Sequence, residues 1–245
     1  MSFNSQFKHI FGETFQSEGF KYCSKLNVFV KMLNEDLLAF MGVKSAPAWN
    51  KGSKGFMVTA GIISTYYDSI EKNSVLMIGH DLNLFLPKNE VRISFEYDDN
   101  TMDEIISTTA LYVRERLIPV INQVFDLNSY IEYLKKYSID LLWDCDSFKG
   151  ESLILIKADN HDDFQKFFQE KVDETNAQID AGMLGVGYTK EDCYNDHFHG
   201  IIERVVYPRD KVYSDKNLYN EALEEAERRK KENIKKLYSY KVLKN

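Results

Sequence analysis

The amino-acid sequence predicts an α+β protein with a mainly antiparallel sheet from the first half of the chain, flanking helices and a helical carboxy-terminal extension. Three observations predict this fold class. The chain opens with an amphipathic helical pattern. Short runs of strand formers then follow one another with short connections. Apolar residues at helical spacing dominate the remainder. Sequential strands with short connections pair antiparallel, because a parallel pair needs a long crossover.

The first predicted element is a helix. Its apolar residues recur at spacings of three and four, which places them on one helical face: Phe3, Phe7, Ile10, Phe11 and Phe15. Gly19 follows and can end the helix in the left-handed conformation.

A β-hairpin is predicted next. Residues 26–33 and 37–43 are rich in strand formers, and the polar tripeptide Asn34-Glu35-Asp36 between them suits a tight turn. An irregular loop follows from Ser45 to Gly55. The other strands predicted in the first half cover residues 56–63, 75–86 and 90–97.

The later part of the chain is predicted to be mostly helical. One helical stripe extends from about residue 101 to Phe125, and Pro119 should kink or restart that helix because its nitrogen carries no hydrogen. The remaining predicted elements are a helix at 129–137, a strand at 152–157, a helix at 162–180, a glycine-rich turn, a strand at 200–207 and a final helix that starts near Ser214.

These elements predict a single domain over residues 1–245. Its core covers about 1–140, and the part at about 141–245 packs on that core. The chain is long enough to bury a substantial core and contains no internal repeat or low-complexity linker.

Composition narrows the expected environment and partners. The chain has 44% hydrophobic and 28% charged residues, a formal net charge of −7 and three scattered cysteines. Negative charge disfavours nucleic acid and anionic membranes as partners, and free thiols suit a reducing compartment. We expect a cytoplasmic protein without a signal peptide or a membrane span.

Part of the chain resembles a known family. The features are the opening helix, the stretch Glu18-Gly19-Phe20-Lys21, the hairpin through Phe29 and Val30, and the run Gly55-Phe56-Met57-Val58-Thr59-Ala60-Gly61-Ile62. In these features the first half of the chain resembles a bacterial domain-of-unknown-function family, the type numbered four-three-zero-four. The resemblance implies a small α+β domain of bacterial origin, and it carries over no catalytic residue because the family has no established activity.

One cluster suggests a metal site. Cys193, Asp196, His197 and His199 lie close in sequence, and on an extended strand both histidines would point to the same face. Such side chains bind zinc or iron. The spacing matches no strong zinc signature, so the alternative is a set of surface or hydrogen-bonded residues.

A second cluster suggests a recognition surface. Trp49, Phe56, Tyr66 and Tyr67 lie around the loop that interrupts the predicted sheet. Aromatic residues of this kind are enriched where proteins bind each other. The alternative is that these rings fill the core or its edge.

The sequence contains no complete catalytic constellation, so it favours a non-enzyme without excluding an enzyme. We expect an intracellular binding or accessory protein, of the immunity type for example, whose negative charge suits a basic protein partner. The alternatives are a metal-binding protein or metal-dependent hydrolase that uses the Cys193 cluster, and a small-molecule binding domain.

Overall fold

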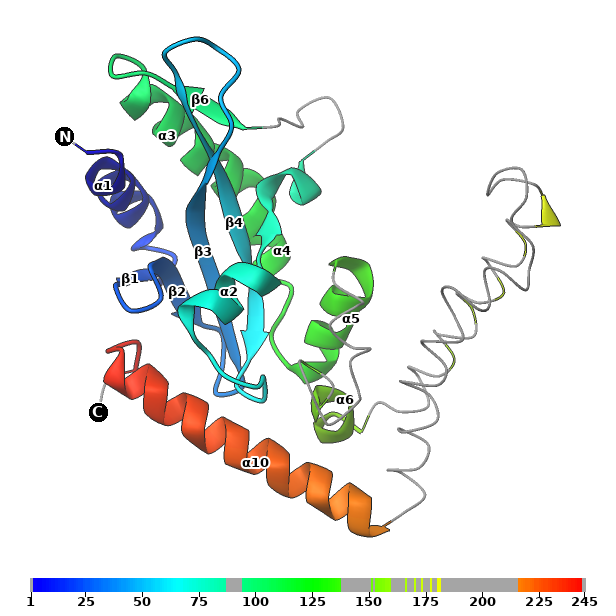
Figure 1. Cartoon of the computed structure of the whole chain (residues 1–245). Coiled ribbons are helices and arrows are strands. Elements are labelled where there is room, and N and C mark those ends of the chain that lie inside the picture. The colour runs from blue at the N-terminus through cyan, green and yellow to red at the C-terminus, as the bar shows by residue number, and fades with distance from the viewer. Residues whose placement is uncertain are drawn as a thin grey trace. The chain divides into compact units, whose positions relative to one another are not determined.

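The computed structural model describes most of the first half of the chain and less of the second (Figure 1). The described residues are 2–86, 94–137, 151, 153–159, 166, 170, 173, 177, 180–181 and 216–243. They form two compact units, which we describe separately. Unit 1 comprises Met1–Thr65, Ser69–Tyr130 and Lys230–Asn245, and unit 2 comprises Tyr66–Asp68 and Ile131–Arg229. The prediction of a single domain stays a prediction.

Unit 1 is built on a six-stranded antiparallel sheet, which confirms the predicted fold class. The strands are β1 (Lys21–Cys23), β2 (Val28–Met32), β3 (Leu37–Ala46), β4 (Lys54–Ser64), β5 (His80–Asp81) and β6 (Phe95–Tyr97). Their order is β1-β2-β3-β4-β5, and β6 also pairs with β4. The ladder between β3 and β4 extends from Leu37 opposite Ser64 to Ala46 opposite Gly55 and forms the centre of the sheet.

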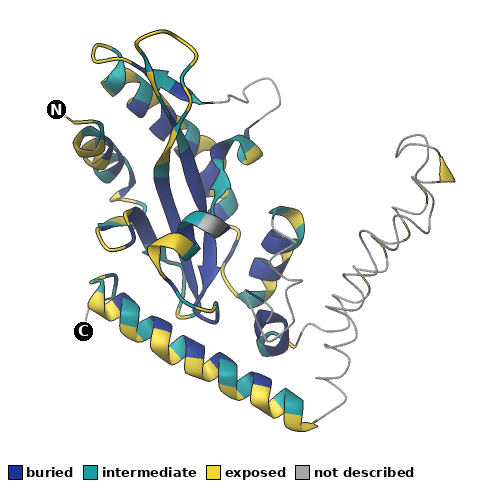
Figure 2. Cartoon of the chain, in the orientation of Figure 1, coloured by how far each residue is buried: buried dark blue, intermediate teal, exposed yellow. Residues whose placement is uncertain are grey.

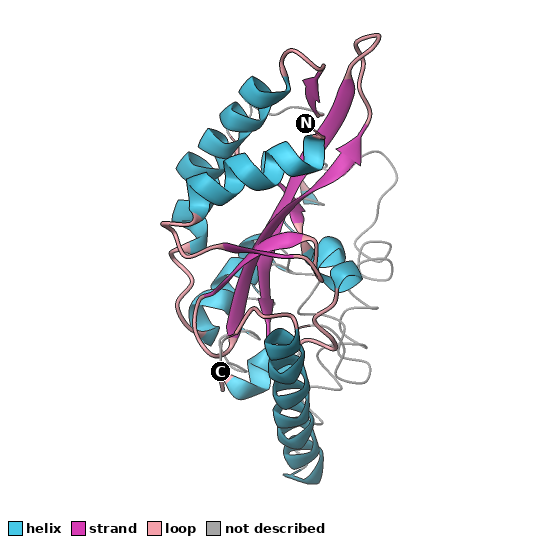
Figure 3. Ribbon diagram, turned by 90° about the vertical axis from the view of Figure 1, so that its left-hand side faces the viewer, coloured by secondary structure: helices cyan, strands magenta, loops and turns pink. Residues whose placement is uncertain are grey.

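Helix α1 (Phe3–Phe15) packs its aromatic face on the sheet, as its spacing predicts. Phe7, Phe11 and Phe15 are buried, and the Phe7 ring meets Phe29 of β2 edge-on with 5.8 Å between centroids. The chain leaves the helix through Gly19, whose φ of 84° is left-handed. Helix α3 (Met102–Tyr112) packs beside α1 on the same side of the sheet (Figure 3).

The effect of Pro119 on the next helix is visible in its hydrogen-bond pattern. After α3 the chain forms a π-helical turn, η2 (Val113–Leu117), and α-helical geometry resumes in α4 (Ile118–Ile121). Proline has no amide hydrogen to donate to the preceding turn, and a π turn is a common way to absorb such a mismatch within a helix. The backbone stays in the right-handed helical region at Tyr112, Leu117 and Ile118, so α4 follows η2 directly.

The strand predicted at 75–86 is wrong. The chain forms a short helix, α2 (Lys72–Ile78), then β5, then the 3₁₀ turn η1 (Leu82–Phe85). Val75 and Ile78 are three residues apart and both buried. This spacing is typical of a helix, but a short apolar run of this kind is also compatible with a strand.

Two contacts fix the backbone on either side of β5. The carboxylate of Asp81 accepts the N–H of Asn83 at 2.9 Å and so starts η1. On the other side, Gly79 lies so close to Thr59 that a Cβ there would be 2.3 Å from the Thr59 hydroxyl. Only glycine fits between α2 and β5 without displacing the sheet.

Helix α5 (Leu127–Tyr137) was predicted at 129–137 and is confirmed. Its first turn is closed by Asp126, whose carboxylate accepts the N–H of Ser129 at 2.8 Å. In unit 1 the buried hydroxyl of Tyr130 donates to the carbonyl of Ile62 at 2.8 Å. This bond covers a carbonyl on the outer edge of β4 that would otherwise be buried without a donor.

Unit 2 contains helix α6 (Leu153–Lys157), where a strand was predicted at 152–157. Leu153, Ile154, Leu155 and Ile156 are all buried. A short run that is buried on every side has no detectable period, so the sequence alone does not separate strand from helix. In the helix predicted at 162–180, the positions that the structure describes are helical. The strand predicted at 200–207 lies outside the described residues.

The final helix, α10 (Lys216–Ser239), is confirmed, and it contributes to both units. Residues up to Arg229 belong to unit 2 and residues from Lys230 belong to unit 1. Within the described parts of the chain, no helix combines the length and apolar character needed to cross a bilayer.

Candidate functional site

The sequence predicts a metal cluster in the second half of the chain. Cys193, Asp196, His197 and His199 all lie outside the described residues. Among the residues that are described, no group of three or more histidine, cysteine or acidic side chains could hold a metal ion. Zinc or iron binding by the Cys193 cluster therefore stays a prediction, and elemental analysis of chelator-free protein is its check.

The predicted aromatic recognition surface is only partly present. Phe56 and Tyr66 are 1% and 2% exposed, so these two residues belong to the core and the prediction is corrected for both. Tyr67 is half-buried, and both tyrosines belong to unit 2, whereas Trp49 and Phe56 belong to unit 1. Trp49 is different, because 72% of its surface is exposed.

Trp49 lies at the tip of the β3–β4 hairpin, which extends beyond β2 on one side and is paired with β6 on the other. We call residues 43–57, the outer part of the β3–β4 hairpin, the finger. Pairing between β2 and β3 ends at Phe29 opposite Met41, whereas β3 and β4 stay paired as far as Ala46 opposite Gly55. The loop of the finger is largely exposed (Figures 1 and 2).

The base of the finger rests on an aromatic cluster. On β4, Phe56 is buried beneath the ring of Phe3 from α1, 4.9 Å away, and stacks on Phe95 of β6 at 5.6 Å. Phe3 also stacks on Tyr97 at 4.9 Å. Aromatic pairs at these distances add stability beyond the area they bury. Phe56 therefore supports the finger instead of forming its binding surface.

The loop at the tip is held by one carboxylate. Glu96 of β6 accepts the backbone N–H of Trp49 at 2.9 Å with one oxygen. Its other oxygen accepts the backbone N–H and the side-chain amide of Asn50 at 3.1 and 2.8 Å. Ser94 donates its hydroxyl to the carbonyl of Pro47 at 2.7 Å. These bonds fix the backbone of Trp49 while its indole faces solvent.

The same bonds keep Glu96 ionised. The backbone N–H groups of Trp49 and Asn50 lower the pKa of Glu96 below its ordinary value of 4.5, since they stabilise the charged form. Both of its oxygens are occupied, so Glu96 positions the loop and is a poor candidate for a general base or a metal ligand.

A shallow hollow of about 260 Å³ lies beside the loop and is lined by Asn50, Ser94, Phe95, Glu96 and Ile105. Pockets for drug-sized ligands typically have volumes of about 300–1,000 Å³ and are mostly apolar. Glu96 and Ser94 already bind the loop. The hollow does not favour the small-molecule alternative.

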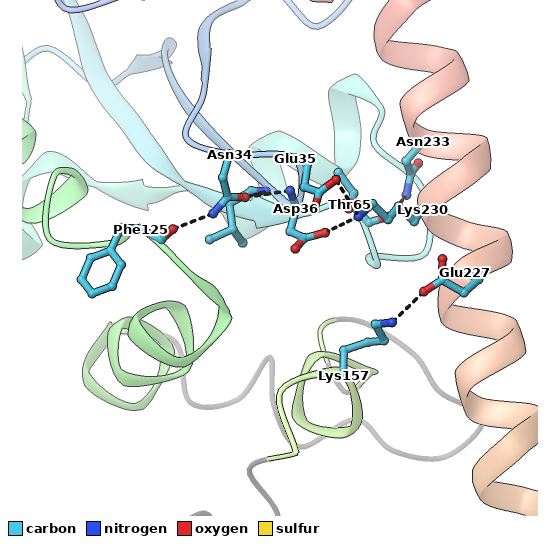
Figure 4. Close-up of polar contacts among 10 residues, drawn as sticks. Asn34, Glu35, Asp36, Thr65, Phe125, Lys157, Glu227, Lys230 and Asn233 are labelled. Atoms are coloured by element: carbon cyan, nitrogen blue, oxygen red, sulfur yellow. Dashed lines mark hydrogen bonds and ion pairs between the residues drawn. The ribbon is translucent and has the colours of Figure 1, made fainter.

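The opposite end of the β3–β4 ladder is closed by hydrogen bonds (Figure 4). In the turn between β2 and β3, the side chain of Asn34 accepts the N–H groups of Asp36 and Leu37 at 2.7 and 2.9 Å. It also donates to the carbonyl of Phe125 at 2.8 Å. Thr65 donates its N–H to the carbonyl of Asp36 at 2.7 Å, which closes the end of the ladder.

The part of α10 that belongs to unit 1 binds this closed end (Figure 4). Lys230 pairs with Asp36 at 2.7 Å. The buried amide of Asn233 accepts the N–H of Ile70 at 2.9 Å and donates to the carbonyl of Thr65 at 3.0 Å. One turn later, Lys236 pairs with Glu71 at 2.8 Å. We call residues Asn34, Asp36, Thr65, Lys230 and Asn233 the α10 latch.

Unit 2 has ion pairs of its own. Arg229 is 7% exposed and binds Asp68 and Glu225 at 2.6 and 2.7 Å. Arg228 and Arg229 lower the pKa of Glu225 to about 2 by donating hydrogen bonds to its carboxylate. Lys157 binds Glu227 at 2.6 Å (Figure 4). These ion pairs join side chains within α10 and connect α10 to α6 and to Asp68.

Comparison with known proteins adds no assignment. No family model matches the chain, and neither a curated protein nor a solved structure is significantly similar to it. The resemblance to a domain-of-unknown-function family stays a prediction.

Proposed function

We propose that this chain is a non-enzymatic protein-binding protein, of the accessory or immunity type, that recognises its partner with the finger. The observation that carries the proposal is the combination of a 72% exposed Trp49 with a loop backbone held by Glu96. Tryptophan is among the residues that most often dominate the energy of a protein interface. A loop that is already ordered loses little conformational entropy on binding.

The net charge of the whole chain favours a basic partner, although the finger itself carries Lys44, Lys51 and Lys54 and no acidic residue. The chain carries a net charge of −7, and an acidic protein is drawn to a basic surface and repelled by other acidic ones. An exposed indole also suits a basic partner, because arginine and lysine side chains stack on its face.

The test is capture of partners from a native lysate at low salt with the full chain as bait. We expect a stoichiometric partner that Trp49→Ala loses. Phe125→Ala is the matched control, because Phe125 is another aromatic residue with 70% exposure, and its backbone is also held by side chains. A partner that both variants retain, or that both lose, would contradict a role for the finger.

A further inference from the structure

The outer edge of β3 has no neighbouring strand within the finger. Strand pairing with β2 ends at Phe29 opposite Met41, Val28 of β2 still lies against Gly42, and the sheet contains no other strand on that side among the described residues. β3 itself continues to Ala46. An edge of this kind presents backbone donors and acceptors in the pattern that another strand would bind.

Hydrogen bonds at the closed end show which residues of β3 face this edge. The N–H of Leu33 donates to the carbonyl of Leu37 at 2.9 Å, so Leu37 directs its backbone groups toward β2. In an antiparallel strand every second residue faces the same side. Val43 and Ser45 therefore direct their N–H and C=O groups away from β4, and Lys44 faces β4 opposite Met57.

The outer edge of β4 provides the contrast. β6 pairs with it at Lys54–Phe56, β5 pairs with it at Thr59–Ala60, and the hydroxyl of Tyr130 covers the carbonyl of Ile62. Along β3, Ser45 is exposed and Val43 is half-buried, and within the described chain neither backbone has a hydrogen-bond partner on the outer side.

We propose that the edge of β3 at Val43–Ser45 binds an extended segment of a partner protein as an added strand. This inference rests on the proposed function and specifies that the partner binds through an extended segment. Only a backbone in extended conformation repeats donors and acceptors at the spacing that Val43 and Ser45 present. Trp49, four residues further along at the tip of the same finger, supplies the anchor for a side chain of that segment.

The experiment uses Ser45→Pro in the full chain, with Ser45→Ala as the matched control. Proline removes the outward N–H and is tolerated where that N–H faces solvent on an edge strand, while alanine keeps the N–H and removes only the hydroxyl. The probe is a linear peptide that is selected on the immobilised wild-type chain from a phage-displayed random library. We expect Ser45→Pro to weaken peptide binding about tenfold, the effect of one lost hydrogen bond, and Ser45→Ala to bind as wild type.

A second readout does not depend on any variant. In the wild-type chain, the amide hydrogens of Val43 and Ser45 should become protected from solvent exchange when the peptide binds, and the amide of Lys44 should change little. This readout tests whether the peptide binds as an added strand even if Ser45→Pro fails to fold.

Four outcomes would overturn the inference. Peptide binding that is lost in Trp49→Ala but unchanged in Ser45→Pro would leave the proposed function in place and remove the added strand. Binding that neither variant changes, or a library that yields no peptide, would count against both. Self-association that Ser45→Pro abolishes in sedimentation would assign the edge to a second copy of the chain.

Discussion

The two ends of the β3–β4 ladder differ in how their polar groups are used. At the closed end, the α10 latch satisfies the backbone of the turn and of the strand ends, and Asn233 is almost fully buried in doing so. In the finger, hydrogen bonds with Glu96 and Ser94 hold the loop from the β6 side and leave Trp49 and Ser45 exposed. One ladder thus combines an end that stabilises the fold with an end that is ordered and exposed.

The largest expected effect belongs to the closed end. Asn233→Ala should lower the free energy of unfolding by about 2–4 kcal/mol, because the N–H of Ile70 and the carbonyl of Thr65 lose their buried partner. Urea denaturation measures the change. Lys231→Ala is the control on the exposed face of the same helix and should stay within about 0.5 kcal/mol of wild type. Equal stabilities for the two variants would show that the latch contributes nothing.

Acid should loosen the finger loop. The pKa of Glu96 is lowered in the folded chain, so its stabilising effect is fully present above 4.5 and is lost as the pH falls through its folded value. We expect the protection factors of the Trp49 and Asn50 amides, which are corrected for the intrinsic exchange rate at each pH, to fall below pH 4.5, as followed by nuclear magnetic resonance. Glu96→Gln removes the titration, and an unchanged pH profile in that variant would contradict the role of the carboxylate.

Removal of the Glu96 side chain should have a local effect. Glu96→Ala leaves the N–H groups of Trp49 and Asn50 without their acceptor, but the loop is exposed and water replaces the carboxylate. We expect the two amides to lose protection while the urea midpoint changes little. A cooperative loss of stability would mean that the finger is part of the folding core.

The smallest effect on stability is expected for Trp49→Ala. The indole is 72% exposed, so its removal should change the free energy of unfolding by no more than about 0.5 kcal/mol. A loss comparable to that of Asn233→Ala would mean that Trp49 is a packing residue and would remove the basis of the proposed function.

The sequence predicted those parts of the fold that depend on local pattern. The face of α1, the hairpin turn at Asn34 and the position of α10 follow from spacing and from turn chemistry, which neighbouring residues determine. The runs at Val75–Ile78 and Leu153–Ile156 were predicted as strands because a buried apolar run of that length fits either structure. The three-residue strand β1 was not predicted, since it is too short to show a period.

The site was harder to predict than the fold. Residue type and loop position place Trp49 on an exposed surface, as observed, but they also place Phe56 and Tyr66 there, because sequence does not distinguish a buried ring from an exposed one. Glu96 was missed because its partners are 46 and 47 residues away. Asn233 left a detectable signal, since it falls four residues before Leu237 on the apolar stripe of the last helix, where a polar residue suggests a buried hydrogen bond.

The central claim, that one ladder has a stabilising end and a binding end, is tested most directly by residue-resolved amide exchange of the free chain. The account predicts strong protection for Thr65 and Ile70, intermediate protection for Lys44, Trp49 and Asn50, and exchange near the unprotected rate for Val43 and Ser45. Protection of Val43 and Ser45 equal to that of Lys44 would show that the edge of β3 is already covered. Such a result would contradict the account.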